Sequence, residues 1–318
     1  MQLFSWVVDF GAVASALGGR LVRLTKLGGL ANESYRVEVV VGGRLEKFAV
    51  KLYRGRDSRL KAERELALFK LMPQYGLRAP QVVFADLEGR LAGKPLLAWR
   101  WVEGVAAEKL LGNPRTRRVA ARAMGAALSR LHTIRASDFE SRLFAGREDF
   151  WAGEAAAISL LAKLSPTEAE GFVELNKELS CLRAERVTLI HGDYNPGNVL
   201  VGDGGIYVMD LEGARLGDPL YDVAYACAFL SFEAGAEATE TFALEYFKLS
   251  HLHPRGLARK LVAAAANLYL LLCYKGTESF LREKAGPLYP VAKALFLEPF
   301  KRHLKTVALE RTVRGRRR

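Results

Sequence analysis

Two side chains that could carry out chemistry lie five residues apart in the second half of the chain, Asp193 and Asn198. They belong to a loop between two short apolar runs, residues 187–190 and 199–201, which are expected to be strands. A carboxylate can orient a hydroxyl group and accept its proton, and an amide oxygen can bind a metal ion. Because strands hold the loop at both ends, we expect the two side chains to serve one site.

A second carboxylate follows at a distance that fits the same site. Residues 206–209 form an apolar run that ends in Asp210, and residues 202–205, three glycines and an aspartate, have the composition of a hairpin turn. A hairpin here would return Asp210 beside Asn198, where both could bind Mg²⁺ together with phosphate and water. Kinases divide the work in this way, with an aspartate for the acceptor hydroxyl and a downstream asparagine for Mg²⁺.

One lysine, Lys51, stands inside the apolar run of residues 48–53. The interior of a strand seldom buries a lysine without a partner, so Lys51 either lies on the exposed face of an edge strand or pairs with an acid. In kinases such a lysine contacts the α- and β-phosphates of ATP and pairs with a glutamate of the next helix. Residues 58–72 are expected to form that helix, and Glu65, on its more apolar face, is the predicted partner in preference to Glu63.

Hydrophobic periodicity predicts the elements around these motifs. Period-two patterns predict strands, and longer amphipathic patterns predict helices. The expected strands cover residues 20–27, 35–41, 45–53, 80–85 and 96–102, and the expected helices cover residues 1–18, 58–72, 116–132, 233–248, 257–275 and 288–308, with two more within 147–182.

The order of the motifs resembles that of a known superfamily. His-Gly-Asp at residues 191–193, Asn198, Asp-Leu-Glu at 210–212 and Gly-Asp-Pro at 217–219 are similar to the motifs of aminoglycoside phosphotransferases and choline kinases. These are kinase-like enzymes that phosphorylate small molecules. The resemblance runs from about residue 24 to about residue 228. Leu211 departs from it, since the family usually carries an aromatic residue after the metal-binding aspartate.

The resemblance implies a protein-kinase-like α+β fold with two lobes. Residues 1–103 would form a nucleotide-binding lobe around an antiparallel sheet, and residues 104–318 a mostly helical catalytic and substrate lobe. Asp193 would be the catalytic base, Asn198 and Asp210 the Mg²⁺ ligands, and ATP the phosphoryl donor. The residues implied for nucleotide binding lie in a glycine-containing loop, in the lysine–glutamate pair and in a hinge whose backbone contacts adenine: Gly28, Gly29, Asn32, Ser34, Lys51, Glu65, Arg100, Trp101, Val102 and Glu103. Without the resemblance, the glycine-containing loop would be interpreted as an ordinary turn.

Several neighbouring polar residues are interpreted as structural. Asp218, followed by a proline, is expected to cap the next helix, and Asp222 in the first turn of that helix is expected to support the loop. His191 is expected to hydrogen-bond to the loop backbone, and His132 to be a satisfied structural histidine. For Glu212 two roles remain open, a contact to metal or substrate and an exposed surface charge.

Composition limits the class of protein. The chain has 318 residues and a net charge of +12, which suits anionic ligands such as nucleotides. No apolar run approaches the roughly 18 residues of a membrane span, and no leader peptide is recognised. Three widely spaced cysteines indicate buried thiols in a reducing compartment, so the expected location is the cytoplasm. The chain has only three glutamines but 47 lysines and arginines. Few heat-labile amide side chains and many residues that form ion pairs indicate a thermophilic source.

Three functions remain open at this point. The first is a small-molecule kinase acting on a hydroxyl of a sugar, an amino alcohol or an aminoglycoside-like compound. The second is an atypical protein kinase, which is disfavoured because Gly192 precedes the aspartate and no Asp-Phe-Gly follows. The third is a non-catalytic nucleotide- or nucleic-acid-binding protein that would use the basic residues after residue 300. The acceptor, the choice between ATP and GTP, and the oligomeric state do not follow from the sequence.

Overall fold

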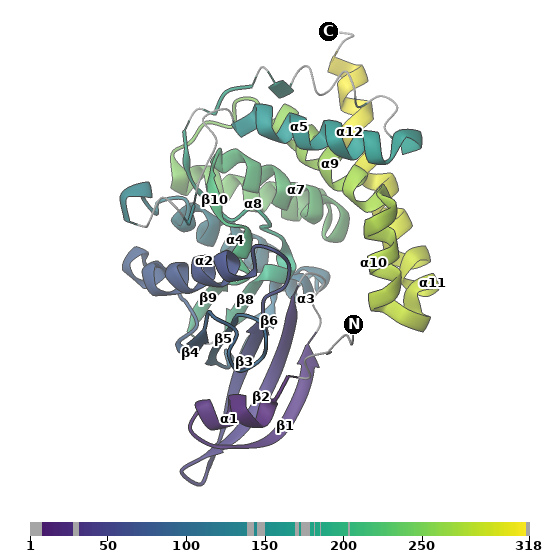
Figure 1. Ribbon diagram of the computed structural model, residues 1–318. Helices are drawn as coiled ribbons and strands as arrows, with labels where there is room; N and C mark the ends of the chain where they lie inside the picture. Colours follow the sequence, from purple (N-terminus) through teal and green to yellow (C-terminus); the bar gives the residue numbers. More distant parts are fainter. Residues whose placement is uncertain are drawn as a thin grey trace. The chain divides into compact units, whose positions relative to one another are not determined.

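The computed structural model of the chain describes residues 8–27, 32–138, 143–144, 150–168, 172, 179–180, 182–184, 186–202 and 204–315. It divides into two compact units, one made of residues 1–104 with 202–213 and the other of residues 105–201 with 214–318. The first unit contains an antiparallel sheet and the second is mostly helical (Figure 1). The predicted α+β, protein-kinase-like fold class is therefore confirmed.

The sheet of the first unit has five strands, and every neighbouring pair is antiparallel. In spatial order the strands are β1 (Arg20–Leu27), β2 (Glu33–Val41), β3 (Arg44–Leu52), β5 (Leu96–Arg100) and β4 (Val82–Asp86). Gly42 and Gly43 close the tight turn between β2 and β3 with φ angles of 55° and 81°, which favour glycine. Because β3 is the middle strand, side chains on it are covered by neighbours on both edges.

Two helices pack on this sheet. α1 (Phe10–Ala16) begins at Asp9, whose carboxylate accepts two backbone N–H groups of the first turn. Its buried face joins inward side chains of the sheet in one hydrophobic core. α2 (Ser58–Leu71) contacts β5, where the ring of Phe69 meets Trp99 edge-on at 5.6 Å. The helix that carries Glu65 is thus fixed to the sheet by apolar packing.

A short stretch from the second half of the chain completes the first unit. Residues 202–213 contain β9 (Gly205–Val208) and a 3-10 turn over Leu211–Gly213. This stretch brings Asp210 into the unit that holds Lys51, although 159 residues separate them in the sequence.

The second unit is a helical assembly. Its described helices are α3 (Ala107–Gly112), α4 (Arg117–Leu131), α5 (Phe150–Leu164), α7 (Pro219–Glu233), α8 (Gly235–Ser250), α9 (Leu257–Cys273), α10 (Lys275–Ala285), α11 (Tyr289–Ala292) and α12 (Glu298–Gly315). α7 buries residues on most of its faces, as expected of a helix surrounded by others, and it contacts α8 and α9. α9 also packs against α5 and α12 (Figure 1). Gly125 lets α4 approach α8 closely, because an added Cβ would lie 2.6 Å from the Phe242 carbonyl oxygen.

Two short antiparallel strand pairs frame the loop of residues 191–198. β7 (Thr188–Ile190) pairs with β10 (Arg215–Gly217), and β6 (Val105–Ala106) pairs with β8 (Val199–Gly202). The loop runs from the end of β7 to the start of β8 and includes a 3-10 turn over Pro196–Asn198. The loop and the strands at its two ends are as the sequence predicts.

The region after α9 differs from the sequence prediction. No helix is predicted over residues 276–285, where the structure has α10, a helix without a buried side chain. The predicted helix of residues 288–308 is instead α11, a π-helical turn over Lys293–Leu297 and α12. Of the two helices predicted within 147–182, α5 is present and the other lies largely outside the described residues.

Within the described residues, no single helix has the length and apolar composition to cross a membrane. One bent pair, α9 with residues 275–308, meets both requirements across an angle of 67°. Of the cysteines, Cys227 is buried and Cys273 partly buried, with no disulfide between them, and Cys181 lies outside the described residues. Burial raises the pKa of the Cys227 thiol to about 12.

Candidate functional site

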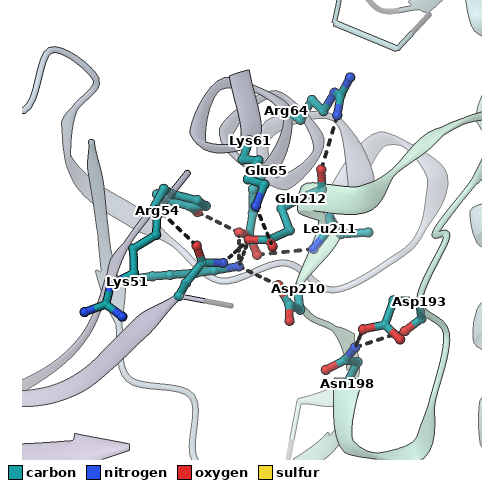
Figure 2. Close-up of polar contacts among 12 residues, drawn as sticks. Lys51, Arg54, Lys61, Arg64, Glu65, Asp193, Asn198, Asp210, Leu211 and Glu212 are labelled. Carbon is teal, nitrogen blue, oxygen red and sulfur yellow. Dashed lines mark hydrogen bonds and ion pairs between the residues drawn. The ribbon is translucent and has the colours of Figure 1, made fainter. Parts of the chain in front are cut away.

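The first unit holds a buried amine among three carboxylates. Lys51 of β3 is only 5% exposed, and its Nζ lies 2.7 Å from Glu65 Oε2, 2.5 Å from Asp210 Oδ1 and 3.1 Å from Glu212 Oε2 (Figure 2). Glu63 instead pairs with Arg59 on the surface of α2 at 2.8 Å. Burial acts to lower the pKa of Lys51, but the three carboxylates outweigh it and raise that pKa above its ordinary value. Lys51 is therefore a fixed positive charge.

Tyr53 directly follows β3, two residues after Lys51, and side chains two residues apart on an extended chain point the same way. Its hydroxyl donates to Glu65 Oε2 at 2.6 Å, and the Lys51 amine lies 4.9 Å from the centre of its ring. Burial, followed by the charge of Glu65, raises the pKa of Tyr53 well above its ordinary value. The hydroxyl therefore stays protonated and donates to the same oxygen as the lysine.

α2 also holds the segment of residues 210–212. The second carboxylate oxygen of Glu65 accepts the Leu211 N–H at 3.3 Å, and Arg64 donates to the Glu212 carbonyl at 3.4 Å. Lys61, one turn earlier on the helix, lies 3.6 Å from the Glu212 carboxylate. Asp210 has a φ of 60°, a left-handed conformation that aspartate tolerates better than most residues. The helix thus holds the two residues that directly follow this strained backbone position.

Asn32 joins the start of β2 to this cluster. Its side-chain oxygen accepts the Arg54 N–H at 3.0 Å, and its amide group donates to the Glu212 carboxylate. Ser34, half-buried on β2, pairs in register with Lys51. Of the glycine-containing loop, Gly28 and Gly29 lie outside the described residues, so their predicted contact with phosphate stays a prediction.

Glu33, next to Asn32, carries a separate ionic contact. Its carboxylate accepts hydrogen bonds from the Tyr35 hydroxyl at 2.6 Å and from Lys94 at 3.3 Å, and it pairs with Arg54. Burial opposes the charged form, but these partners together lower the pKa of Glu33 to about 2.

The predicted hinge begins at Arg100, the last residue of β5. The N–H groups of Arg100 and Trp101 already donate to the carbonyls of Gln81 and Lys47, at 2.9 and 3.0 Å. The Arg100 guanidinium pairs with Glu46 at 2.8 Å, and the Trp101 ring faces Arg36 at 5.2 Å. Val102 and Glu103 lie beyond the strand. The exposed Glu103 carboxylate pairs with Lys47 at 3.0 Å, and the hydrogen bond from this lysine lowers the pKa of Glu103. The sheet thus already uses the N–H groups of the first two hinge residues.

In the second unit, neutral donors surround the carboxylate of Asp193. Asn198 Nδ2 donates to Asp193 Oδ2 at 3.1 Å and to the Asp193 carbonyl at 2.9 Å (Figure 2). Asn195 Nδ2 and the Tyr225 hydroxyl donate to Asp193 Oδ1 at 3.0 and 2.8 Å. The backbone N–H of Asp193 donates to His191 Nδ1 at 3.2 Å, in agreement with the predicted role of His191.

Asp222 anchors the backbone before this aspartate. Its two carboxylate oxygens accept the N–H groups of His191 and Gly192, at 2.6 and 2.9 Å. His132 Nε2 lies 3.1 Å from the same carboxylate, and His132 Nδ1 lies 2.8 Å from the Tyr246 hydroxyl. Burial would raise the pKa of Asp222, but the hydrogen bonds and charges of the histidines lower it. Asp222 and His132 are thus structural, as predicted.

Asp218 fixes the start of α7. Its Oδ1 caps the helix by accepting the Leu220 N–H at 2.9 Å, in agreement with the sequence prediction. Its Oδ2 pairs with the buried Lys260 at 2.6 Å and accepts the Trp151 indole N–H at 2.8 Å. The first turn of α7, which carries Asp222, is therefore held from α5 and α9.

Two groups have the donor chemistry for a divalent cation. Ligand oxygens of Glu65, Asp210 and Glu212 lie within 4.8 Å of one another in the first unit. In the second unit, the Asn198 amide nitrogen is committed to Asp193, so its oxygen is the end left for a ligand. The side chains of Glu65, Asp210, Glu212 and Asn198 all offer oxygen donors of the kind that Mg²⁺ prefers. The positive charge of Lys51 offsets part of the repulsion among the three carboxylates. The residues therefore fit a magnesium-binding role.

Sequence reasoning did not identify Tyr53, Asn195 or Tyr225. For Tyr53 the signal was its place two residues after Lys51 on one strand. For Asn195 it was the position two residues after Asp193, where asparagine side chains commonly bond the local backbone. Tyr225 lies 32 residues from Asp193, and no spacing rule connects them.

The family model described as "Phosphotransferase enzyme family" matches residues 24–259. Among curated proteins, acyl-CoA dehydrogenase family member 10 of Mus musculus is 25% identical over 174 residues, which are 52% of this chain but only 16% of that protein.

Solved structures show the same fold at low identity. An aminoglycoside phosphotransferase-like protein from Ralstonia eutropha has a TM-score of 0.68 at 15% identity, covering 94% of this chain and 98% of that one. Choline kinase LicA from Streptococcus pneumoniae has a TM-score of 0.62 at 19% identity, with 94% and 97% covered. The amicoumacin kinase hAmiN, solved in complex with AMP-PNP, Ca²⁺ and Ami, has a TM-score of 0.60 at 14% identity, with 94% of both chains covered.

Proposed function

Because the chain belongs to the phosphotransferase enzyme family, we propose that it is a kinase that transfers the γ-phosphoryl group of ATP to a hydroxyl group of a small molecule. The observation that carries the proposal is the Lys51 amine, buried in the middle of a sheet and balanced by carboxylates of α2 and of residues 210–212. Burying a charge costs free energy, and pairing with carboxylates offsets much of that cost without making the charge more stabilising than an apolar side chain would be. A lysine kept in a strand interior therefore supports a role in binding an anion.

Lys51 would contact the phosphates of ATP, and Glu65 and Tyr53 would hold the amine in place. Asn32 and Ser34, with Gly28 and Gly29, would form the loop beside the phosphates. The adenine edge would be read mainly at Val102 and Glu103, since the sheet already uses the N–H groups of Arg100 and Trp101. Residues 1–103 would thus be the nucleotide-binding part, to which residues 202–213 of the same compact unit add Asp210 and Glu212.

Asn198 and Asp210 would hold Mg²⁺, with Glu212 positioned by Asn32 and Lys61 as a further oxygen donor. When bound, Mg²⁺ would neutralise charge on the phosphates during transfer. The AMP-PNP and Ca²⁺ bound in the structural relative hAmiN support the proposal that this chain binds a nucleoside triphosphate together with a divalent cation.

Asp193 would be the base of the reaction, in the part formed by residues 104–318. Its carboxylate would accept a hydrogen bond from the acceptor hydroxyl and take the proton as the new P–O bond forms. Asn195, Asn198 and Tyr225 hold this carboxylate by neutral hydrogen bonds, so its charge is not cancelled by a cation among the described residues. Candidate acceptors are sugars, amino alcohols and aminoglycoside-like compounds, and the proposed location is the cytoplasm.

The test is ATP consumption with Mg²⁺ against a panel of hydroxyl-containing metabolites, followed by Asp193→Ala with the best acceptor. Turnover should fall about 10²- to 10⁴-fold while calorimetry still detects MgATP binding. Asp57→Ala, which removes an exposed carboxylate without a capping hydrogen bond, is the control. Normal phosphotransfer by the Asp193→Ala protein would refute the assignment of the base.

A further inference from the structure

The two oxygens of the Asp193 carboxylate have different surroundings. Oδ1 accepts two hydrogen bonds, from Asn195 Nδ2 at 3.0 Å and from the Tyr225 hydroxyl at 2.8 Å. Oδ2 accepts one, from Asn198 Nδ2 at 3.1 Å. A carboxylate oxygen has two lone-pair positions, so both positions are filled on Oδ1 and one remains on Oδ2.

The donors on Oδ1 are themselves fixed. The Asn195 side-chain oxygen accepts the Gly197 N–H at 2.9 Å, which turns its NH₂ group toward Asp193. The ring of Tyr225, on α7, stacks on Tyr221 at 6.0 Å and packs against Phe229 at 5.4 Å. The hydroxyl is thus held in place by packing that does not involve Asp193.

Tyr225 remains a donor throughout the neutral range. Burial, followed by the charge of Asp193, raises its pKa well above the ordinary value for tyrosine. A tyrosine that served only to pack α7 would not need its hydroxyl near a carboxylate. Tyr221, stacked beside it, instead has its polar partner in Arg215.

We propose that Tyr225 is a positioning residue which, together with Asn195, occupies Oδ1 of Asp193 and so assigns Oδ2 as the oxygen that receives the acceptor hydroxyl. This inference rests on the proposed role of Asp193 as the base. Rotation of the carboxylate would break two hydrogen bonds on one side, so the pair keeps Oδ2 in a single orientation. Oδ2 is also the oxygen that accepts from Asn198, a proposed Mg²⁺ ligand, so the proton would be taken on the side of Asn198.

The experiment compares Tyr225→Phe with Tyr221→Phe, which removes the neighbouring hydroxyl and leaves the ring stack in place. Hydrolysis of MgATP, with water as the acceptor, gives kcat and KM for each protein, and ¹³C NMR follows the Asp193 carboxyl resonance. We expect Tyr225→Phe to lower kcat about tenfold with the KM for MgATP within about twofold of wild type. Tyr221→Phe should keep the wild-type kcat, and only Tyr225→Phe should shift the Asp193 resonance.

A double-mutant cycle with Asn195→Ala tests whether the two donors act on the same oxygen. The losses in kcat should be strongly non-additive, because either single change already frees Oδ1 to rotate. A wild-type kcat and an unshifted Asp193 resonance in Tyr225→Phe, or equal losses in the two tyrosine variants, would overturn the inference. Asp193→Ala separates a failure of the proposed base from a failure of the role of Tyr225. If Asp193→Ala hydrolyses MgATP at the wild-type rate, the proposed base is wrong. If Asp193→Ala is inactive and Tyr225→Phe keeps the wild-type rate, only the role of Tyr225 is rejected.

Discussion

The two groups of proposed active-site residues are held in different ways. Around Lys51, one buried cation is balanced by Glu65, Asp210 and Glu212, which lie 14, 159 and 161 positions away in the sequence. Around Asp193, the donors to the carboxylate within the described part of the chain are all neutral, and two of them lie within five residues of it in the sequence. The first group depends on charge balance across a folded unit, and the second on the local shape of a loop.

The difference matches what each group is proposed to do. A group that binds a highly charged nucleotide gains from fixed charges that are already paired and buried, since they need little rearrangement when phosphate arrives. A base must keep a carboxylate able to take a proton, and a lysine salt bridge would oppose that. We therefore expect mutations in the two groups to differ in size and in kind.

The largest effect on stability is expected from Lys51→Met. It leaves three carboxylates within 4.8 Å without their central cation, so the free energy of unfolding should fall by about 3–5 kcal/mol, measured by urea denaturation. Lys47→Met, which removes an exposed lysine of the same strand paired with Glu103, is the control and should cause no measurable loss. Similar losses in the two variants would show that the cluster is not dominated by charge balance.

A smaller loss of about 2–3 kcal/mol is expected from Asp222→Ala in the second unit. Two backbone N–H groups, of His191 and Gly192, would lose their buried acceptor. Hydrogen exchange of these two amides should accelerate more than that of the helices around them. Glu240→Gln, an exposed acid of α8, is the control, and unchanged exchange at residues 191 and 192 would contradict the anchoring role.

The effect of Glu33→Gln should depend on pH. The folded-state pKa of about 2 lies below the ordinary value of 4.5, so the charged form contributes stability above pH 4.5 that is lost as the pH falls toward 2. The variant should lose about 1 kcal/mol at pH 7, after allowance for solvent screening, and the loss should shrink steadily below pH 4.5. Urea titrations at several pH values provide the measurement, and a loss that is independent of pH would exclude the ionic explanation.

The smallest effect is expected from Lys61→Gln at the edge of the Lys51 cluster. Lys61 is partly exposed and lies 3.6 Å from Glu212, so its pair should contribute only about 0.5 kcal/mol. A loss of several kcal/mol in the same denaturation assay would mean that the cluster needs two cations rather than one.

The sequence predicted well those features that depend on short spacing. The positions of Asp193 and Asn198 in a loop between strands follow from apolar runs, and the strand of Lys51 and the helix of Glu65 follow from hydrophobic periodicity. These patterns are set by neighbours in the chain, so they are visible before the chain folds.

Long-range partners were not predictable in the same way. The contact between Asn32 and Glu212 joins residues 180 positions apart, and that of Tyr225 with Asp193 joins a helix to a loop. Such contacts are decided by how elements pack, and a single sequence contains no periodic signal for them. The helix α10, which buries no side chain, was not predicted either.

The assignment of residues 202–213 to the first unit has a practical consequence for dissecting the protein. A fragment cut after residue 104 would keep Lys51 and Asn32 but lack Asp210, which pairs with Lys51, and Glu212, which contacts both side chains. Neither half of the chain is therefore a self-sufficient piece for nucleotide-binding studies. An isolated N-terminal fragment would regain its missing partners only if residues 202–213 were grafted back onto it.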